Sequence, residues 1–438
     1  MANKGLQIAK CDALEILDSR GNPTVQATVV LQDGSIGSAS VPSGASTGIY
    51  EAHERRDGDQ SRFFGKGVAN AVTDIRQKIS PALCGLCADD QTLIDRTLCE
   101  LDGTENKSRL GANTILAVSL ANAHAAAAHH RLALWQYLGG ASASRLPVPM
   151  MNVLNGGAHA SNNVEIQEFM LVPVGAESFA EALRIGSEIY HALGRRLKRA
   201  GETTAVGDEG GFAPNLASDE QALDLLCQAI EDAGYNTACV KLALDAAASE
   251  WMPEDAFDAN APVYHLPKRG KKMTGAELIE YWEGLSKKYP LISLEDGLDQ
   301  RDFASWTPLT ERLGKGMLLV GDDLFVTNET RLKMGITHRA ANTILIKPNQ
   351  IGTLSETLNV IRLAKDAGYN YILSHRSGDT EDATLADIAV ATGAPLIKSG
   401  APCRSERVAK YNRLLAIEHS LGNAASYGGQ HVLLSIKE

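Results

Sequence analysis

Residues 291–295 read LISLE, residues 317–322 read MLLVGD and residues 343–347 read TILIK: each is a short apolar run that ends in a charged side chain. The same pattern recurs at residues 240–245, 369–375 and 395–398. Most of these runs are spaced by the length of one strand–helix unit, which predicts a parallel sheet. The interval from Asp245 to Glu295 could hold two units, or one with an insertion.

A closed barrel of such units would bring the strand ends together on one face, where the loops build an active site. A doubly wound open sheet is the alternative, although no GxGxxG fingerprint follows a first strand. We therefore expect an α/β barrel in this part of the chain.

The first forty residues read differently, as a small antiparallel sheet with a turn at Asp33-Gly34. Helical spacing follows over residues 66–138, including an alanine-rich segment, 112–137, that stops at Gly139-Gly140. Strands followed by helices predict a separate α+β domain. We place the boundary near the proline-containing stretch 146–149 and predict domains at residues 1–143 and 144–438.

Composition excludes several classes of function. The chain has 42 basic and 53 acidic residues, a net charge of −11, and no dense basic run that could follow a phosphate backbone. Nucleic acid is therefore not an expected ligand. Residues 1–10 contain no signal-length apolar run and no stretch is long enough to span a membrane, so we expect a cytoplasmic protein.

Seven cysteines in a long chain indicate reduced thiols. Cys84 and Cys87 form a CxxC without a second metal-binding pair at zinc-finger spacing. We expect them to be buried neighbours on a helix rather than a metal or redox site.

Three of the apolar runs end in a carboxylate, at Asp245, Glu295 and Asp322. Three like charges held together are costly unless a cation lies between them. All-oxygen ligation favours a hard cation such as Mg²⁺. Any one of these acids could be a surface salt-bridge partner, but three in one periodic frame predict a metal site.

Two later runs end in lysine, at Lys347 and Lys398. A lysine near a metal cation and another lysine should have a depressed pKa, which makes its amine available as a general base. A structural ion pair is the alternative for either lysine alone. In SHRSGDTED, Arg376 and Ser377 follow a strand and could cradle a phosphate or carboxylate, or Ser377 could simply cap a helix.

Glycine-rich segments carry further acids. In GDEGGFAPN, Glu209 stands on a backbone that can approach a ligand closely, which suits a proton donor. Glu168 in QEF would be a second carboxylate that keeps one acid of the pair protonated near neutrality. The loops at 43–48 and 155–163 could be lids. Alternatively, these segments are ordinary surface turns and His159 has a structural role.

The segments SGASTG, GGAHASNNVEIQEFM, GDEGGFAPN, LALDAAASE, SLEDGL, VGDDLFVTN, ILIKPNQIGTLSET, SHRSGDTED and IKSGAPCRSERVAKYN together resemble the enolase family, in its order and over essentially the whole chain. The run ILIKPNQIGTLSE is the most specific. The resemblance implies an N-terminal α+β domain that caps an enolase-type (β/α)8 barrel. It also implies phosphopyruvate hydratase activity, the reversible dehydration of 2-phosphoglycerate to phosphoenolpyruvate in glycolysis. Two Mg²⁺ ions per active site and a homodimer, or an octamer of dimers, would accompany this activity.

Carried over position by position, the resemblance makes Lys347 the general base and Glu209 the general acid, with Glu168 supporting it. Asp245, Glu295 and Asp322 would bind the tightly held Mg²⁺, and Ser46 would help to bind the second. Substrate contacts would come from His159, Gln167, His375, Arg376, Ser377 and Lys398. The metal ions and Lys398 would stabilise the negative charge that collects on the substrate carboxylate.

Two departures from the family pattern leave fine loop geometry open: Asp379 stands where glutamate is usual, and Gly297 where many members have proline. Three rival functions are weighed against the resemblance. Another superfamily enzyme, such as a sugar-acid dehydratase or racemase, would lack several of the segments above. A Schiff-base aldolase would work in a chelator and be trapped by borohydride. A non-catalytic scaffold or surface adhesin would be favoured if catalytic positions were missing, and they are present.

Overall fold

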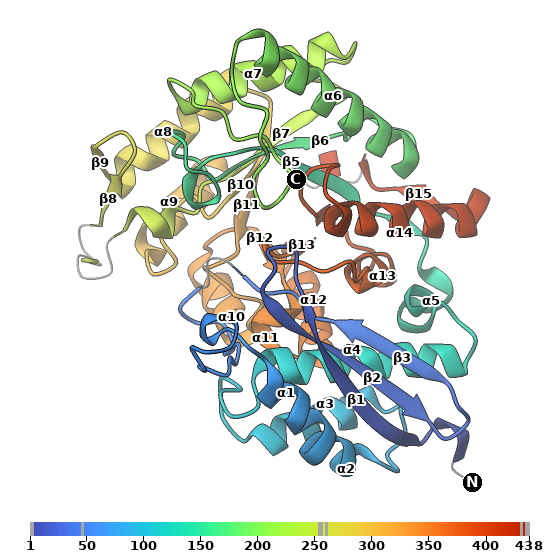
Figure 1. Cartoon of the computed structure of the whole chain (residues 1–438). Coiled ribbons are helices and arrows are strands. Elements are labelled where there is room, and N and C mark those ends of the chain that lie inside the picture. The colour runs from blue at the N-terminus through green and yellow to red at the C-terminus, as the bar shows by residue number, and fades with distance from the viewer. Residues whose placement is uncertain (1–3, 45–47, 253–256, 259–261, 430–431, 434–438) are drawn as a thin grey trace. The chain divides into compact units, whose positions relative to one another are not determined.

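The structure is a computed structural model that describes residues 4–44, 48–252, 257–258, 262–429 and 432–433 (Figure 1). The chain divides into two compact units, each described here by itself. The first comprises Met1–Ser144, Ile346–Arg362 and His375–Gly393, and the second comprises Arg145–Leu345, Leu363–Ser374 and Ala394–Glu438. Ser46, predicted to help bind a second metal ion, lies outside the described residues.

The first unit begins with an antiparallel sheet of β1 (Ile8–Leu17), β2 (Pro23–Leu31) and β3 (Ile36–Ser40). The predicted turn at Asp33-Gly34 joins β2 to β3, with Gly34 at a φ of 88°. Helix α4 (Ala112–His129) packs against β2 and β3 (Figure 1). It approaches so closely that a Cβ on Gly37 would lie 2.1 Å from the Ala125 nitrogen. The predicted α+β arrangement is confirmed.

The remaining helices of this unit depart from prediction in two places. The expected helical segment 112–137 is interrupted, because α4 ends at His129 and Arg131 adopts a φ of 57° before α5 begins. Cys84 and Cys87 are exposed, because α2 ends at Leu83, so the expectation of buried helical neighbours is wrong. The helices are α1 (Ala69–Asp74), α2 (Ser80–Leu83), α3 (Gln91–Asp102), α5 (Leu134–Gly139), α11 (Pro348–Ile351) and α13 (Thr384–Thr392), and α12 (Leu354–Asp366) runs into the second unit.

The second unit contains a closed barrel, and all six apolar runs singled out in the sequence are among its strands. In barrel order the strands are β5 (Val148–Asn155), β6 (Glu168–Val172), β7 (Lys241–Asp245), β10 (Leu291–Glu295), β11 (Leu318–Gly321), β12 (Thr343–Ile346), β13 (Asn370–Ser374) and β14 (Leu396–Lys398). The predicted fold class, an α+β domain followed by a barrel, is confirmed.

One strand breaks the expected parallel pattern, because β6 is antiparallel to both β5 and β7. The connection between β5 and β6, described over its whole length, contains no α-helix, and a connection without a helical crossover joins antiparallel neighbours. Where the structure describes the long interval before β10, it contains one α-helix and an inserted hairpin, β8 (Val263–Leu266) and β9 (Lys271–Thr274), rather than two strand–helix units. The alternative of a single unit with an insertion is the correct one.

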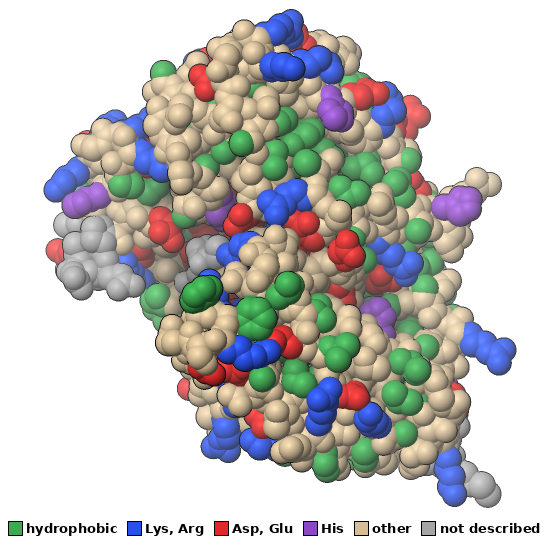
Figure 2. Space-filling view, viewed as in Figure 1, with side chains coloured by type: hydrophobic (Ala, Val, Ile, Leu, Met, Phe, Trp, Pro, Cys, Tyr) green, Lys and Arg blue, Asp and Glu red, His purple; other side chains and the backbone are tan. Residues whose placement is uncertain are grey.

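Apolar side chains fill the barrel interior, with Val148, Met170, Ala243, Val320 and Leu345 in one buried cluster. The helices of the second unit include α6 (Phe179–Arg199), α7 (Asp219–Asp232), α8 (Gly275–Lys288), α9 (Phe303–Leu313), α10 (Glu329–His338) and α14 (Ser405–Leu421). Outside the barrel, β4 (Arg145–Leu146) pairs with β15 (Ser426–Tyr427). Among the residues described, no helix is long and apolar enough to cross a membrane. Basic and acidic side chains are interspersed on the face shown in Figure 2.

Candidate active site at one end of the barrel

The strand register places three carboxylates side by side at one end of the barrel. Glu168 is opposite Asp245, and Asp245 is opposite Glu295, on the neighbouring strands β6, β7 and β10. Because β6 runs antiparallel, its first residue lies at the end where β7 and β10 finish. All three side chains are buried. Local strand geometry therefore builds a row of acids without any contribution from loops.

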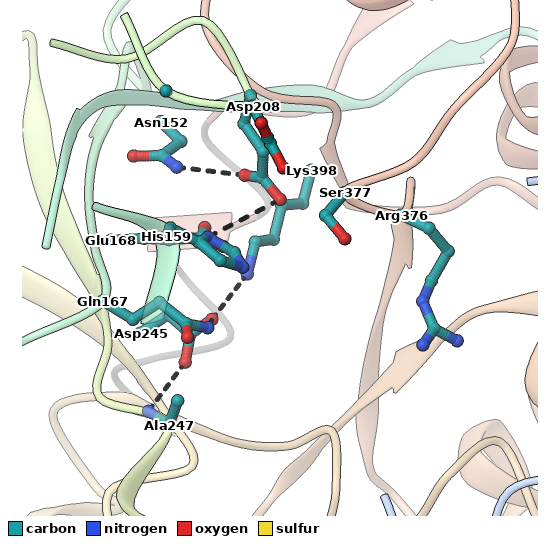
Figure 3. A network of polar contacts seen from close by, with 12 residues as sticks. Asn152, His159, Gln167, Glu168, Asp208, Asp245, Ala247, Arg376, Ser377 and Lys398 are labelled. Carbon is teal, nitrogen blue, oxygen red and sulfur yellow. Dashed lines mark hydrogen bonds and ion pairs between the residues drawn. The ribbon is translucent and has the colours of Figure 1, made fainter. Parts of the chain in front are cut away.

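Lys398, the last residue of β14, reaches into this row (Figure 3). Its Nζ lies 2.9 Å from Glu168 Oε2, 3.1 Å from Asp245 Oδ2 and 2.8 Å from Glu295 Oε2, and its side chain is only 3% exposed. Burial alone would lower the pKa of Lys398, but the carboxylates outweigh it and raise that pKa well above the ordinary value. These carboxylates favour the charged form of Lys398. The depressed pKa expected from the sequence assumes a metal cation beside the lysine and stays a prediction.

One ammonium does not balance the acids around it. Burial raises the pKa of Glu168 well above its ordinary value, and the carboxylates of Glu209 and Asp245 raise it further. Burial likewise raises the pKa of Glu295, with additional contributions from Asp245 and Asp322. Three buried carboxylates share one lysine, so this end of the barrel favours the uptake of positive charge.

Glu209 is carried by the glycine-rich segment 207–211 and is buried. Its Oε2 accepts a hydrogen bond of 3.0 Å from Asn152 Nδ2, on β5. Two other elements hold the segment: Tyr190 on α6 donates to the Gly210 carbonyl at 2.9 Å, and Arg407 on α14 donates to the Asp208 carbonyl at 3.1 Å. A carboxylate fixed in this way can meet a proton acceptor in a defined direction.

His159 and Gln167 lie beside the acids. His159 Nδ1 is 3.5 Å from Glu168 Oε1 and 3.9 Å from Glu209 Oε1, and Gln167 Nε2 is 3.4 Å from Asp245 Oδ2. Within the described part of the chain, His159 Nδ1, Gln167 Oε1 and Asn152 Oδ1 are buried without a hydrogen-bond partner. Buried polar atoms are nearly always paired, so this group is suited to a polar ligand.

Asp322 lies just beyond β11, in a loop built around Asp296. The Asp296 carboxylate accepts hydrogen bonds from the backbone nitrogens of Asp322 and Asp323 at 3.0 and 2.8 Å, and Asp296 itself has a φ of 40°. Aspartate is among the residues other than glycine that adopt this left-handed conformation most readily. The carboxylate oxygens of Asp296, Asp322 and Asp323 lie close enough together to hold a cation, and a second such group comprises a ring nitrogen of His159 and oxygens of Glu168 and Glu209.

The predicted metal ligands Asp245, Glu295 and Asp322 are electrostatic neighbours, since both aspartates raise the pKa of Glu295. Lys398 lies between Asp245 and Glu295. All three candidate donors are buried carboxylates. This donor set fits Mg²⁺ better than a softer metal.

The other predicted site residues belong to the first unit. Lys347 directly follows β12 and precedes α11. His375, Arg376 and Ser377 follow β13 and are all buried. Arg376 forms a two-pronged ion pair with Glu51, with Nη1 to Oε2 at 2.9 Å and Nη2 to Oε1 at 3.2 Å. A guanidinium held flat in this way presents its remaining donors in a fixed plane.

Glu51 also binds other segments of the first unit. Its Oε1 accepts hydrogen bonds from the Gly48 backbone at 3.0 Å and from Gln350 Nε2 at 3.3 Å. Asp379, one of the two departures from the family pattern, accepts from the Arg376 backbone at 3.3 Å and from the Thr380 backbone at 2.7 Å. The shorter side chain therefore closes the turn that carries Arg376.

Sequence reasoning missed Asn152, Asp296 and Glu51 as site-building residues. Asn152 was detectable as a polar residue inside the otherwise apolar run 148–154, and Asp296 as the second acid of SLEDGL. Glu51 gave no such signal, because its partner Arg376 is distant in the chain and only folding brings the two together.

Comparison with known protein families covers nearly the whole chain. Residues 8–138 match the model described as the enolase N-terminal domain. Residues 143–436 match the model described as the enolase C-terminal TIM barrel domain. The two matches follow one another in the order found in the family, and the second alone spans more than half of the chain. The chain belongs to the enolase family.

Proposed function

We propose that this protein catalyses the reversible, Mg²⁺-dependent dehydration of 2-phosphoglycerate to phosphoenolpyruvate, as a lyase of glycolysis. The observation that carries the proposal is the row of buried carboxylates around Lys398 at the end of a barrel that belongs to the enolase family. Such a site favours positive charge and suits a reaction in which negative charge grows on a small acid.

In the first step, Lys347 Nζ would take the proton from C2 of 2-phosphoglycerate, and the electron pair left behind would spread onto the adjacent carboxylate. Lys398 remains cationic in its acidic surroundings, so it would stabilise that carboxylate rather than act as a base. The two lysines would therefore have different roles, with Lys347 as the base and Lys398 as the cation that faces the substrate carboxylate.

In the second step, the bond between C3 and its hydroxyl oxygen breaks and the C2–C3 double bond forms. Hydroxide is a poor leaving group, so Glu209 would give it a proton and water would leave. Asn152 fixes one oxygen of Glu209. Glu168, whose pKa is raised by burial and by Glu209, would help to keep an acidic proton in this pair.

Asp245, Glu295 and Asp322 would hold Mg²⁺, which when bound supplies positive charge against the substrate carboxylate. Arg376 and Ser377, with His159, Gln167 and His375, would contact the anionic substrate. Arg376 offers planar donors suited to a phosphate or carboxylate. We also propose a cytoplasmic homodimer or an octamer of dimers, which sedimentation of the purified protein would distinguish.

The test is the formation of phosphoenolpyruvate from 2-phosphoglycerate, followed by the absorbance of the product, with Mg²⁺ and again after exhaustive chelation. Product only with Mg²⁺ supports the proposal. Folded, metal-loaded protein that forms no product but dehydrates another sugar acid would instead be a different superfamily enzyme. Activity retained in chelator and trapped by borohydride would indicate a Schiff-base aldolase. No activity on any substrate would favour a scaffold.

A further inference from the structure

The β8–β9 hairpin is an addition to the barrel of the second unit. Its two strands, paired from Val263 with Thr274 to Leu266 with Lys271, form a sheet of their own and contribute no strand to the barrel (Figure 1). A hairpin of two short strands is only marginally stable by itself. Contacts made by its turn therefore show what the hairpin is joined to.

The turn binds the segment that carries His159. Lys268 Nζ donates to the carbonyl oxygens of Gly157 at 2.8 Å and Ala160 at 3.1 Å, and lies 3.4 Å from Asn162 Oδ1. An ammonium group has three donors and no acceptor, so these three oxygens match its full capacity. The two carbonyls lie on either side of His159 in the chain.

The next residue of the turn holds the far end of the same segment. The Arg269 backbone nitrogen donates to Glu165 Oε1 at 2.8 Å, and Arg269 Nη2 lies 2.9 Å from Asp219 Oδ2. The other oxygen of Asp219 accepts from the backbone nitrogens of Glu165 and Ile166 at 3.0 and 3.3 Å. Two adjacent residues of the hairpin turn thus bind both ends of residues 157–166.

The segment has little regular structure to hold its shape. Only one short 3-10 turn, Gly157–His159, lies within it, and Gly157 has a φ of 51°. A Cβ at Gly157 would lie 2.9 Å from the Gln167 Cα, so the backbone passes very close to the residue that precedes β6. Side-chain bonds from outside therefore have a large share in fixing where His159 points.

We propose that Lys268 is a positioning residue, whose ammonium group fixes residues 157–162 so that the His159 ring faces Glu168, Glu209 and the anionic substrate. The inference rests on the proposed function for its effect on substrate. The claim that Lys268 orders residues 157–162 does not depend on the proposed function. His159 lies within 4 Å of both carboxylates, so a small displacement of the segment would change its reach.

The experiment compares Lys268→Met, which keeps the apolar stem but removes the donors, with Lys268→Arg and with Lys272→Met. Lys272 is an exposed residue on β9 of the same hairpin and serves as the matched control. Hydrogen exchange of the peptide covering residues 156–166 is measured by mass spectrometry without substrate. The values of kcat and KM for 2-phosphoglycerate are measured with Mg²⁺.

For Lys268→Met we expect exchange in this peptide to be about tenfold faster, and KM to rise roughly five- to tenfold with kcat within about threefold of wild type. Lys268→Arg should recover part of both effects, and Lys272→Met should match wild type. Unchanged exchange in Lys268→Met would overturn the inference. So would a lower melting temperature with fewer active molecules and an unchanged KM, since that pattern indicates general stabilisation only.

The two proposals fail in distinguishable ways. If wild-type protein forms no phosphoenolpyruvate, the proposed function fails, and the exchange measurement alone decides whether Lys268 orders the His159 segment. If wild type is active but Lys268→Met behaves like Lys272→Met in both measurements, the inference about Lys268 fails and the proposed function stands.

Discussion

Lys398 and Arg376 are both buried cations paired with carboxylates, but their surroundings differ. Both side chains are 3% exposed. Arg376 binds Glu51 through two parallel contacts and is also an electrostatic neighbour of Glu54. Lys398 has three acids within 3.1 Å of its Nζ. The first arrangement is a matched pair in the first unit, and the second leaves negative charge in excess in the barrel.

The Arg376–Glu51 pair fixes the orientation of a planar group, whereas the cluster around Lys398 attracts positive charge. A two-pronged arginine–carboxylate pair satisfies its own charge and holds a planar group in place. A cluster with more acids than bases raises the pKa of its carboxylates, as at Glu168 and Glu295, and is relieved by protons or a cation. We therefore expect substitutions in the cluster to affect metal dependence and turnover, and those at the pair to affect substrate binding.

The largest loss of turnover is expected for Lys347→Ala. This substitution leaves the acids of the cluster, Lys398 and Arg376 in place, so it tests proton abstraction without changing either arrangement of buried charges. Loss of a general base lowers turnover by about 10²–10⁴-fold. Mg²⁺ binding, measured by titration calorimetry, should stay close to wild type. Turnover near the wild-type value would remove Lys347 from the role of base.

Lys398→Met should have the next largest effect, since it leaves three buried carboxylates without their ammonium. Breaking a buried pair costs about 3–5 kcal/mol, so metal-free protein should melt at a lower temperature and turnover should fall at least about 10²-fold. Lys333→Met removes an exposed ion pair with Glu329 and is the control, with little change expected. If the two variants melted at the same temperature in chelator, the cluster would carry no excess of negative charge.

Glu51→Gln tests the other side of the comparison. The amide keeps the size of the side chain but loses the charge that holds Arg376, so we expect KM for 2-phosphoglycerate to rise about tenfold with a small change in kcat. Glu100→Gln, at an exposed position of α3 in the same unit, is the control. A Glu51 variant with wild-type KM and reduced metal affinity would reverse the roles given to the pair and the cluster.

The smallest effect is a change with pH in the stabilisation by Mg²⁺. Acids whose pKa is raised by folding bind protons more tightly in the folded state, so metal-free protein loses stability as pH rises from the unfolded pKa towards the folded one. Metal binding requires the ionised carboxylates, so its stabilising effect grows over the same range. The rise in melting temperature on adding Mg²⁺ should be larger at about pH 8 than at about pH 6. A pH-independent rise would argue against ligation by Glu295 and its neighbours.

The strand ends were predictable because each buried strand is a short apolar run closed by a polar residue. Asp245, Glu295, Lys347 and Lys398 could be placed at one end of a barrel on that basis alone. Strands β5 and β6 were missed, because Pro149 and Asn152 interrupt the apolar run of β5 and because β6 begins, rather than ends, with its charged residue, Glu168. The glycine- and asparagine-rich connection between them was a usable signal, since a short connection of this composition does not predict an α-helical crossover and so implies antiparallel neighbours.

The contacts that define the charges could not be predicted. The pKa of Lys398 depends on acids from three other strands, and spacing along the chain does not reveal which of them lie within reach. Lys268 is a similar case, because its partners lie more than one hundred residues earlier and nothing in the local sequence distinguishes it from the exposed Lys272. Register and loop packing, which only the fold supplies, decide these pairings.

The most direct test of the proposed chemistry is the exchange of the C2 proton of 2-phosphoglycerate with deuterated water, followed by NMR in wild type, Lys347→Ala and Glu209→Gln with Mg²⁺. We predict that Glu209→Gln still exchanges this proton while forming little phosphoenolpyruvate, because the base remains and only departure of the hydroxyl group is blocked. Lys347→Ala should do neither. Exchange that persists in Lys347→Ala, or disappears in folded, metal-loaded Glu209→Gln, would contradict the assignment of base and acid.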